Sequence, residues 1–272
     1  MSTGPADVYL HGHHDSVLRS HRWRTAANSA THLLPHLREG MSLLDVGCGP
    51  GTVTVDLARS VAPGEVVGLD SAPEVLEEAR AHAADAGVGT VRFEVGDAYR
   101  LPFDDASFDV VHAHQLLQHL TDPVAALREM RRVARPGGLV AVRDSDYGGF
   151  AWFPESDGLE EWRQLYREVA AALGAQADAG RRLSSWVREA GFDPDGVEVG
   201  AGTWCYATAV ERAWWSRLWA DRCVASGFAS AALAHGLADE VALEQLAEAW
   251  RAWGEEQDGW FVVLHGEVLA RA

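Results

Sequence analysis

The chain has 272 residues, of which 47% are hydrophobic and 23% are charged, and its formal net charge is −17. These proportions are typical of a globular protein, and no apolar run is long enough to span a bilayer, so membrane insertion is not expected. The acidity would repel phosphate groups, so nucleic acid is not expected as a partner. All 23 basic residues are arginine, which excludes mechanisms that need a lysine nucleophile or a lysine-containing phosphate loop.

The amino end lacks the basic start and apolar stretch of a secretory signal, and we therefore expect a cytoplasmic protein. The three cysteines, Cys48, Cys205 and Cys223, lie far apart in the sequence without CxxC spacing. This pattern indicates neither a disulfide framework nor a thiolate metal site. No metal is expected.

The first predicted region, residues 1–38, reads mostly as helix after Asp15, and six of the twelve histidines lie between Val8 and Leu37. We expect this region to form a lid over a binding site. The stretch "HGHH" at 11–14 offers candidate bases, among them His14, although polar residues of a lid would show the same composition.

Residues 39–146 alternate short apolar runs with amphipathic stretches, which is typical of a parallel sheet covered by helices. The predicted strands are Ser42 to Val46, Glu65 to Asp70, Thr90 to Val95, Phe108 to Ala113 and Leu139 to Arg143. The sequence between these strands indicates where two helices begin. Ser71 with Glu74 forms the pattern of a capping box, and Asp122 precedes Pro123 at the start of another helix.

Residues 147–272 are rich in tryptophan. Apolar residues recur at helical spacing in three stretches, and core packing is the plainest interpretation of each. The stretches contain Leu159, Trp162, Leu165, Tyr166 and Val169; Leu183, Trp186 and Val187; and Leu243, Leu246, Trp250 and Trp253. Two strands are predicted, from Gly196 and from Trp260, with helical material between them. No linker or repeat is visible, so the whole chain is predicted to be a single domain.

A glycine loop, "LLDVGCGPGT" at 43–52, follows the first predicted strand, and Asp70 ends the second strand nineteen residues after Gly51. This arrangement is shared by binders of NAD and of S-adenosylmethionine, because both ligands carry an adenosine ribose. Asp45 favours the second, since its charge would oppose a pyrophosphate but suits an ammonium group. The "GDA" element at 96–98 and the spacing of the glycines favour it too.

The motifs "LLDVGCGPG", "VVGLDSAPEVLEEA", "GDAYRLPF", "FDVVHAHQLLQHL" and "VARPGGLVAVRD" follow one another through residues 42–144. In this order they resemble a class I S-adenosylmethionine-dependent methyltransferase, similar to the menaquinone and ubiquinone C-methyltransferases. The resemblance implies a Rossmann-like α/β fold with helices on both faces of a seven-stranded sheet. It implies the strand order 3-2-1-4-5-7-6, with the last strand antiparallel.

The resemblance also implies cofactor contacts. Asp45 and the glycine loop would line the methionyl and ribose side, Asp70 would hold the ribose, and Asp97 with Ala98 would meet the adenine. Arg24 is a candidate for the cofactor carboxylate, and Tyr9 for an aromatic face near the sulfonium. The predicted cofactor-binding residues are Tyr9, Arg24, Asp45, Gly47, Cys48, Gly49, Gly51, Asp70, Ser71, Asp97, Ala98, His114 and Gln115, with Cys48 interpreted as a packing residue rather than a nucleophile.

Histidine is the natural general base where an acceptor must lose a proton. The candidates are His114 and His119, which follow the fourth predicted strand, and His14. Asp144 and Asp146 either face the acceptor or serve the turn before Gly148. Tryptophans 152, 204, 214, 215 and 219 predict an aromatic cap over the acceptor.

The predicted function is methylation of a small, hydrophobic or aromatic metabolite by a monomer or homodimer. One alternative is a protein that binds the cofactor without transferring a methyl group, in a structural role or as a catalyst of rearrangement. A nicotinamide dehydrogenase is disfavoured by Asp45 and by the "GDA" element.

Overall fold

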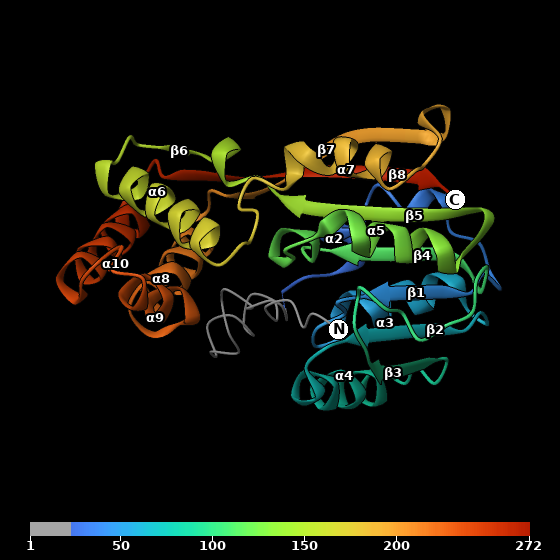
Figure 1. The fold of residues 1–272 in the computed structure, drawn as a ribbon. Helices are drawn as coiled ribbons and strands as arrows, with labels where there is room; N and C mark the ends of the chain where they lie inside the picture. The colour runs from blue at the N-terminus through green and yellow to red at the C-terminus, as the bar shows by residue number, and fades with distance from the viewer. Residues whose placement is uncertain (1–22) are drawn as a thin grey trace.

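The computed structural model describes residues 23–272, which fold around a central β-sheet (Figure 1). Within the described residues the sheet has eight strands in the order β3-β2-β1-β4-β5-β8-β6, with β7 paired to β8. The first five strands run parallel, and β8 lies antiparallel to its neighbours. The strands are β1 Leu43–Val46, β2 Val66–Asp70, β3 Val91–Val95, β4 Phe108–His114, β5 Ala134–Ser145, β6 Ala151–Phe153, β7 Val197–Tyr206 and β8 Trp260–Arg271.

The predicted strand order is confirmed, because β7 and β8 occupy the places expected for the sixth and seventh strands. The predicted strand number is corrected by β6, a three-residue strand that the sequence did not indicate. β6 pairs with the first residues of β8, and β5 pairs with the later residues of β8 along the same edge. β7 pairs with β8 along the opposite edge. β6 is too short to show an alternating pattern, and it forms because the twelve-residue β8 extends beyond the end of β5.

Helices cover both faces of the sheet. Side chains of α5 and α7 pack on one face, and those of α2 and α3 on the other, since successive residues of each strand point to opposite faces. The helices are α2 Ala26–Ser29, α3 Thr52–Val61, α4 Pro73–Asp85, α5 Pro123–Val133, α6 Asp157–Ala172, α7 Leu183–Glu189, α8 Ala209–Ala225, α9 Gly227–Ala234 and α10 Glu240–Glu255, with 3-10 turns η1 Leu34–His36, η2 Leu117–His119, η3 Tyr147–Gly149, η4 Gly180–Arg182 and η5 Pro194–Gly196.

The two predicted helix starts have different outcomes. Asp122 caps α5, because its carboxylate accepts a hydrogen bond from the backbone N–H of Ala125. The capping box at Ser71 is wrong: α4 begins at Pro73, and no side chain caps it. Asp70 Oδ1 accepts from the N–H of Ala72 at 3.1 Å, which fixes the turn just before the helix.

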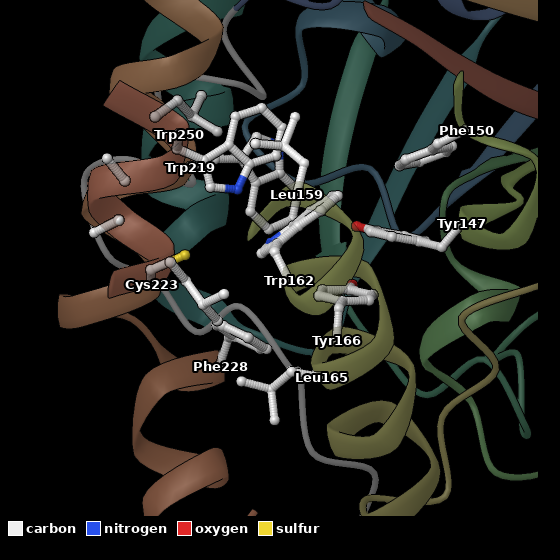
Figure 2. Close-up of a cluster of buried hydrophobic side chains, with 14 of the residues drawn as sticks. Tyr147, Phe150, Leu159, Trp162, Leu165, Tyr166, Trp219, Cys223, Phe228 and Trp250 are labelled. Carbon is white, nitrogen blue, oxygen red and sulfur yellow. The ribbon is translucent and has the colours of Figure 1, made fainter. Parts of the chain in front are cut away.

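Helices α6, α8, α9 and α10 form a helical unit beside the carboxyl ends of the parallel strands, and β8 runs from this unit into the sheet (Figure 1). An aromatic cluster fills the unit (Figure 2). Trp162 lies at its centre, with its ring centroid 4.4 Å from that of Trp219 and 4.8 Å from that of Trp250. The packing interpretation is confirmed, since every apolar residue of the three predicted stripes is buried.

In the part of the chain that the structure describes, no helix is both long enough and apolar enough to cross a membrane. The single-domain division remains a prediction, and most of the expected lid falls in residues 1–22, outside the described residues.

Candidate active site

The glycine loop connects β1 to α3, and steric constraints explain why glycine occupies three of its positions. Gly47, Gly49 and Gly51 all have positive φ values, of +73°, +54° and +76°. A Cβ atom on Gly47 would lie 2.9 Å from the side chain of Leu116, and one on Gly51 would lie 3.0 Å from the Phe93 ring. Side chains are therefore absent both because the turn needs a left-handed backbone and because neighbouring side chains approach closely.

Asp70 shapes this loop from the end of β2. Its Oδ2 accepts a hydrogen bond from the N–H of Gly49 at 2.9 Å, while Oδ1 accepts from Ala72. These two bonds hold the carboxylate against the glycine loop. Asp70 borders the cavity described below, as the ribose assignment requires.

Asp45 is buried at the end of β1 and holds two partners. Thr54 donates to its Oδ2 at 2.6 Å, and Nδ1 of His112 lies 2.7 Å from its Oδ1. His112 was missed by the sequence analysis, although its place two residues before His114 puts both side chains on one face of β4. The pair fixes the acid behind the glycine loop.

One cavity, of about 800 Å³, runs along the carboxyl ends of the parallel strands. Most of the predicted cofactor-binding residues line it. These are Arg24, Asp45, Gly47, Cys48, Gly49, Asp70, Ser71, Asp97, Ala98, His114 and Gln115. Gly51 does not line it, because it packs against Ala79 and Phe93 at the start of α3. Tyr9 and His14 lie outside the described residues.

His114 ends β4 and borders the cavity, although its side chain is almost fully buried. Neither ring nitrogen has a hydrogen-bond partner among residues 23–272. Burial, assisted by the guanidinium groups of Arg143 and Arg24, lowers the pKa of His114 well below its usual value. The imidazole is therefore neutral at physiological pH and has one nitrogen able to accept a hydrogen bond.

Gln115 adopts a positive φ of +52°, which turns the chain at the end of β4. Its Nε2 donates to Ser145 Oγ at 2.7 Å and lies 2.9 Å from Nε2 of His265. Its Oε1 accepts a hydrogen bond from the guanidinium of Arg24 at 2.6 Å. The amide of Gln115 therefore holds Arg24 at the part of the cavity that the glycine loop borders. Contact between Arg24 and a cofactor carboxylate remains a prediction.

His119 closes η2 and borders the same cavity. Gln118 Nε2 lies 3.0 Å from His119 Nε2, so the amide can donate to this ring nitrogen and orient the ring. His114 and His119 are thus brought to one cavity, as the sequence predicted for residues after the fourth strand.

Cys48 packs beneath the loop with Val55, Leu76 and Phe93. Burial raises the pKa of its thiol well above the usual value, so the group stays protonated. This agrees with the packing interpretation and not with a nucleophile.

The acid near the end of β5, Asp144, and the acid directly after that strand, Asp146, both have structural partners. Asp144 is fully buried and accepts from the N–H of Gln118, and burial raises its pKa to about 7. Asp146 accepts from the backbone and guanidinium of Arg181, which holds η4 in place. Neither acid lines the cavity, and their carboxylates bond to residues of η2 and η4 rather than within the turn before Gly148, so neither predicted role is supported.

Aromatic side chains line the other part of the cavity. Of the five tryptophans predicted to form a cap, Trp204, Trp215 and Trp219 border the cavity. Trp152 and Trp214 do not, because Trp152 stacks on Phe261 and Trp214 packs near Tyr206. Tyr147, Phe150 and Arg222 border the cavity and were missed by the sequence analysis. The first two follow β5 directly, which was the available signal.

These residues fit an adenosyl sulfonium cofactor. The backbone of Gly47 and Gly49 borders the cavity, and acids from the ends of three neighbouring strands, Asp45, Asp70 and Asp97, border it as well, as a cationic sulfonium cofactor with an adenosine ribose would require. Among the described residues no cluster of three histidine, cysteine or acidic side chains is placed to hold a metal ion.

Comparisons with known proteins agree with this geometry. The family described as "Methyltransferase domain" matches residues 37–191. An uncharacterized methyltransferase of Schizosaccharomyces pombe is 34% identical over 96% of this chain and 95% of its own length. The 27-O-demethylrifamycin SV methyltransferase of Amycolatopsis mediterranei is 38% identical over 61% of this chain and 58% of its own. The solved structure of the YcgJ protein of Bacillus subtilis shares the fold, with a TM-score of 0.55, 22% identity and coverage of 89% and 98%.

Proposed function

The chain belongs to the methyltransferase family as a class I S-adenosylmethionine-dependent enzyme, and on that premise we propose that its acceptor is a small, largely apolar or aromatic molecule. The predicted fold, cofactor and enzyme class are thereby confirmed. The acceptor, the oligomeric state and the cytoplasmic location remain predictions.

One observation carries the proposal: the cavity is continuous between the glycine loop and an aromatic wall. This wall is formed by Tyr147, Phe150, Trp204, Trp215 and Trp219. Its volume of about 800 Å³ lies near the upper end of the roughly 300–1,000 Å³ common for small-molecule sites. Side chains such as Phe150 and Trp215 offer flat apolar surface to an acceptor. The relative from Amycolatopsis is named for a demethylrifamycin acceptor rather than for a protein or a nucleic acid.

S-adenosylmethionine supplies an activated methyl group, so the chain's main work is to align the acceptor and to exclude water. Trp204 and the rings of the helical unit exclude water from the acceptor side. We assign His114 the contact with the acceptor, because it borders the cavity and its ring nitrogens have no partner among residues 23–272. A neutral imidazole with a lowered pKa accepts a hydrogen bond and orients an acceptor hydroxyl, but it binds the proton weakly.

The test is a screen for release of S-adenosylhomocysteine with panels of aromatic phenols, aromatic acids, polypeptides and nucleic acids. We expect turnover with members of the small-molecule panels only. Activity solely on polypeptides would refute the proposed acceptor class. Replacement of His114 by alanine is expected to lower kcat while the affinity for S-adenosylhomocysteine, measured by calorimetry, changes little. An unchanged kcat would remove His114 from its assigned role.

A further inference from the structure

Asp45 is a buried acid whose contacts do not include a guanidinium group. Only 3% of its surface is exposed, and among residues 23–272 its carboxylate bonds to Thr54 and His112 but to no arginine. Asp146, which is buried to a similar degree, forms an ion pair with Arg181. A buried carboxylate needs hydrogen bonds and a nearby opposite charge to stay ionised at little cost. Because Asp45 borders the cavity, a cationic ligand bound there would supply that charge.

The contact between Asp45 and His112 follows from the pairing of two strands. Asp45 of β1 and His112 of β4 are direct partners in the parallel register, so their side chains lie next to each other on one face of the sheet. Thr54 reaches the same carboxylate from α3, the helix that follows the glycine loop. The acid is thus held by a strand and by a helix at the base of this loop.

The hydrogen bonds of His112 define the role of each ring nitrogen. An ionised carboxylate only accepts hydrogen bonds, so Nδ1 of His112 carries the hydrogen and donates to Asp45 Oδ1 over 2.7 Å. Nε2 has no hydrogen-bond partner among residues 23–272, although the ring is fully buried. An apolar side chain would fill this place in β4 without leaving a ring nitrogen unpaired. The bond to the acid is therefore what explains a histidine at this position.

We propose that His112 is a positioning residue for the methyl donor: its Nδ1–H holds the Asp45 carboxylate so that the charge of Asp45 selects the ammonium group of S-adenosylmethionine. Thr54 holds the other oxygen of the same carboxylate. The two hydrogen bonds stabilise the ionised acid away from water and fix its orientation. This inference goes beyond the proposed function, because it concerns the methyl donor and holds for any acceptor.

The first test compares S-adenosylhomocysteine with its deamino analogue, in which hydrogen replaces the α-amino group, by calorimetry. The two probes share the adenosine, the thioether and the carboxylate, so a difference in affinity reports on the amino group. We expect S-adenosylhomocysteine to bind at least ten-fold more tightly, which is about 1.4 kcal/mol. Equal affinities, or binding of neither probe, would overturn the inference. A failed acceptor screen would refute the proposed function and leave this comparison intact.

The second test assigns the preference to one nitrogen of His112. His112→Phe keeps a flat ring without nitrogens, and its preference for the amino group should fall below about three-fold. His112→Asn places an amide N–H near the position of Nδ1 and should retain the preference. The control is His82→Phe, which changes an exposed histidine of α4 and should bind both probes as the unmodified protein does.

The ratio of the two affinities separates positioning from a merely structural role. A structural role would weaken the binding of both probes of S-adenosyl type equally, so an unchanged ratio in His112→Phe would overturn the proposal. Loss of the preference in His112→Asn would overturn the assignment to Nδ1. If His112→Phe does not fold, the asparagine variant and the comparison of the two probes in the unmodified protein decide the proposal.

Discussion

The sheet half and the helical half of this protein bury their side chains by different means. The sheet half encloses polar groups that hold one another, such as Asp45 with Thr54 and His112, or Arg143 with Glu267 at 2.9 Å. The helical half encloses aromatic rings, with Trp162 touching Trp219 and Trp250.

The difference corresponds to what each half borders in the cavity. Polar ligand groups need fixed donors and acceptors, whose positions the parallel strands set through their shared register. A flat apolar ligand needs shape and the exclusion of water, which packed rings provide without directional bonds. Each prediction below tests the role assigned to one half or compares a change in each half.

The largest effect is expected in the aromatic cluster. Trp162→Ala should lower the free energy of unfolding by about 3–5 kcal/mol, because it leaves a large cavity among rings that cannot collapse. Chemical denaturation would measure this, with calorimetry of S-adenosylhomocysteine on the folded variant. Trp260→Ala is the control, since Trp260 is 41% exposed. A loss no larger than in the control, or an abolished cofactor affinity, would contradict the division between the halves.

Acid should act on the sheet half. Burial lowers the pKa of His32 to about 3, and lowers the pKa values of His114 and His265 well below the usual value. In the unfolded protein these histidines bind protons below about pH 6.5, whereas in the folded protein they do not. The free energy of unfolding therefore falls as the pH drops below that value. Asp144 acts in the opposite direction, because its raised pKa of about 7 lets the folded state bind a proton first.

With three histidines against one carboxyl, the free energy of unfolding should fall by about 2–4 kcal/mol between pH 6.5 and pH 5, at about 1.4 kcal/mol per pH unit for each net proton. His32→Gln should reduce this slope by about one proton, whereas a change at His82, which is exposed, should not. Denaturant titrations at a series of pH values would measure the slopes. An equal slope in His32→Gln and the unmodified protein would remove His32 from this account.

Asp70→Ala tests the side of the cavity that is expected to bind the cofactor. This change removes both the expected bonds to a ribose and the existing bonds to Gly49 and Ala72. The affinity for S-adenosylhomocysteine should weaken by about 1–3 kcal/mol, the scale of a lost charge-assisted hydrogen bond. Asp85→Ala serves as the control, because Asp85 is an exposed acid at the end of α4. Calorimetry that finds no change at Asp70 would count against its assignment.

The smallest effect compares a helix cap that the structure shows in the helical half with a predicted cap that is absent from the sheet half. Thr208 forms a capping box with Glu211 at the start of α8, so Thr208→Ala should cost about 1 kcal/mol of stability. Ser71 caps nothing at α4, so Ser71→Ala should cost less than about 0.5 kcal/mol. Thermal or denaturant unfolding distinguishes the two, and equal losses would mean that the caps do not differ.

The parts of the fold that could be predicted are those that depend on patterns of neighbouring residues in the sequence. Runs of alternating and apolar residues located seven strands to within a few residues, except that β5 begins five residues before the predicted Leu139. Asp122 before Pro123 indicated a helix start for a local reason, the reach of a short side chain to a nearby N–H. The capping box at Ser71 failed because the residue directly before α4 is Ala72, so Ser71 lies one position too early to cap the helix.

The sequence by itself determined the nucleotide-binding side of the cavity, because loop, strand end and acid are close together along the chain and their spacing is set by the strand–loop–helix unit. Only the tertiary structure decided which residues complete the aromatic part of the cavity, where Tyr147, Phe150 and Arg222 join the predicted tryptophans although tens of residues separate the elements that carry them. Which faces of α8 and of β7 turn toward that cavity depends on how α6 and α10 pack behind them. That packing is a long-range balance of apolar contacts, to which no local spacing corresponds.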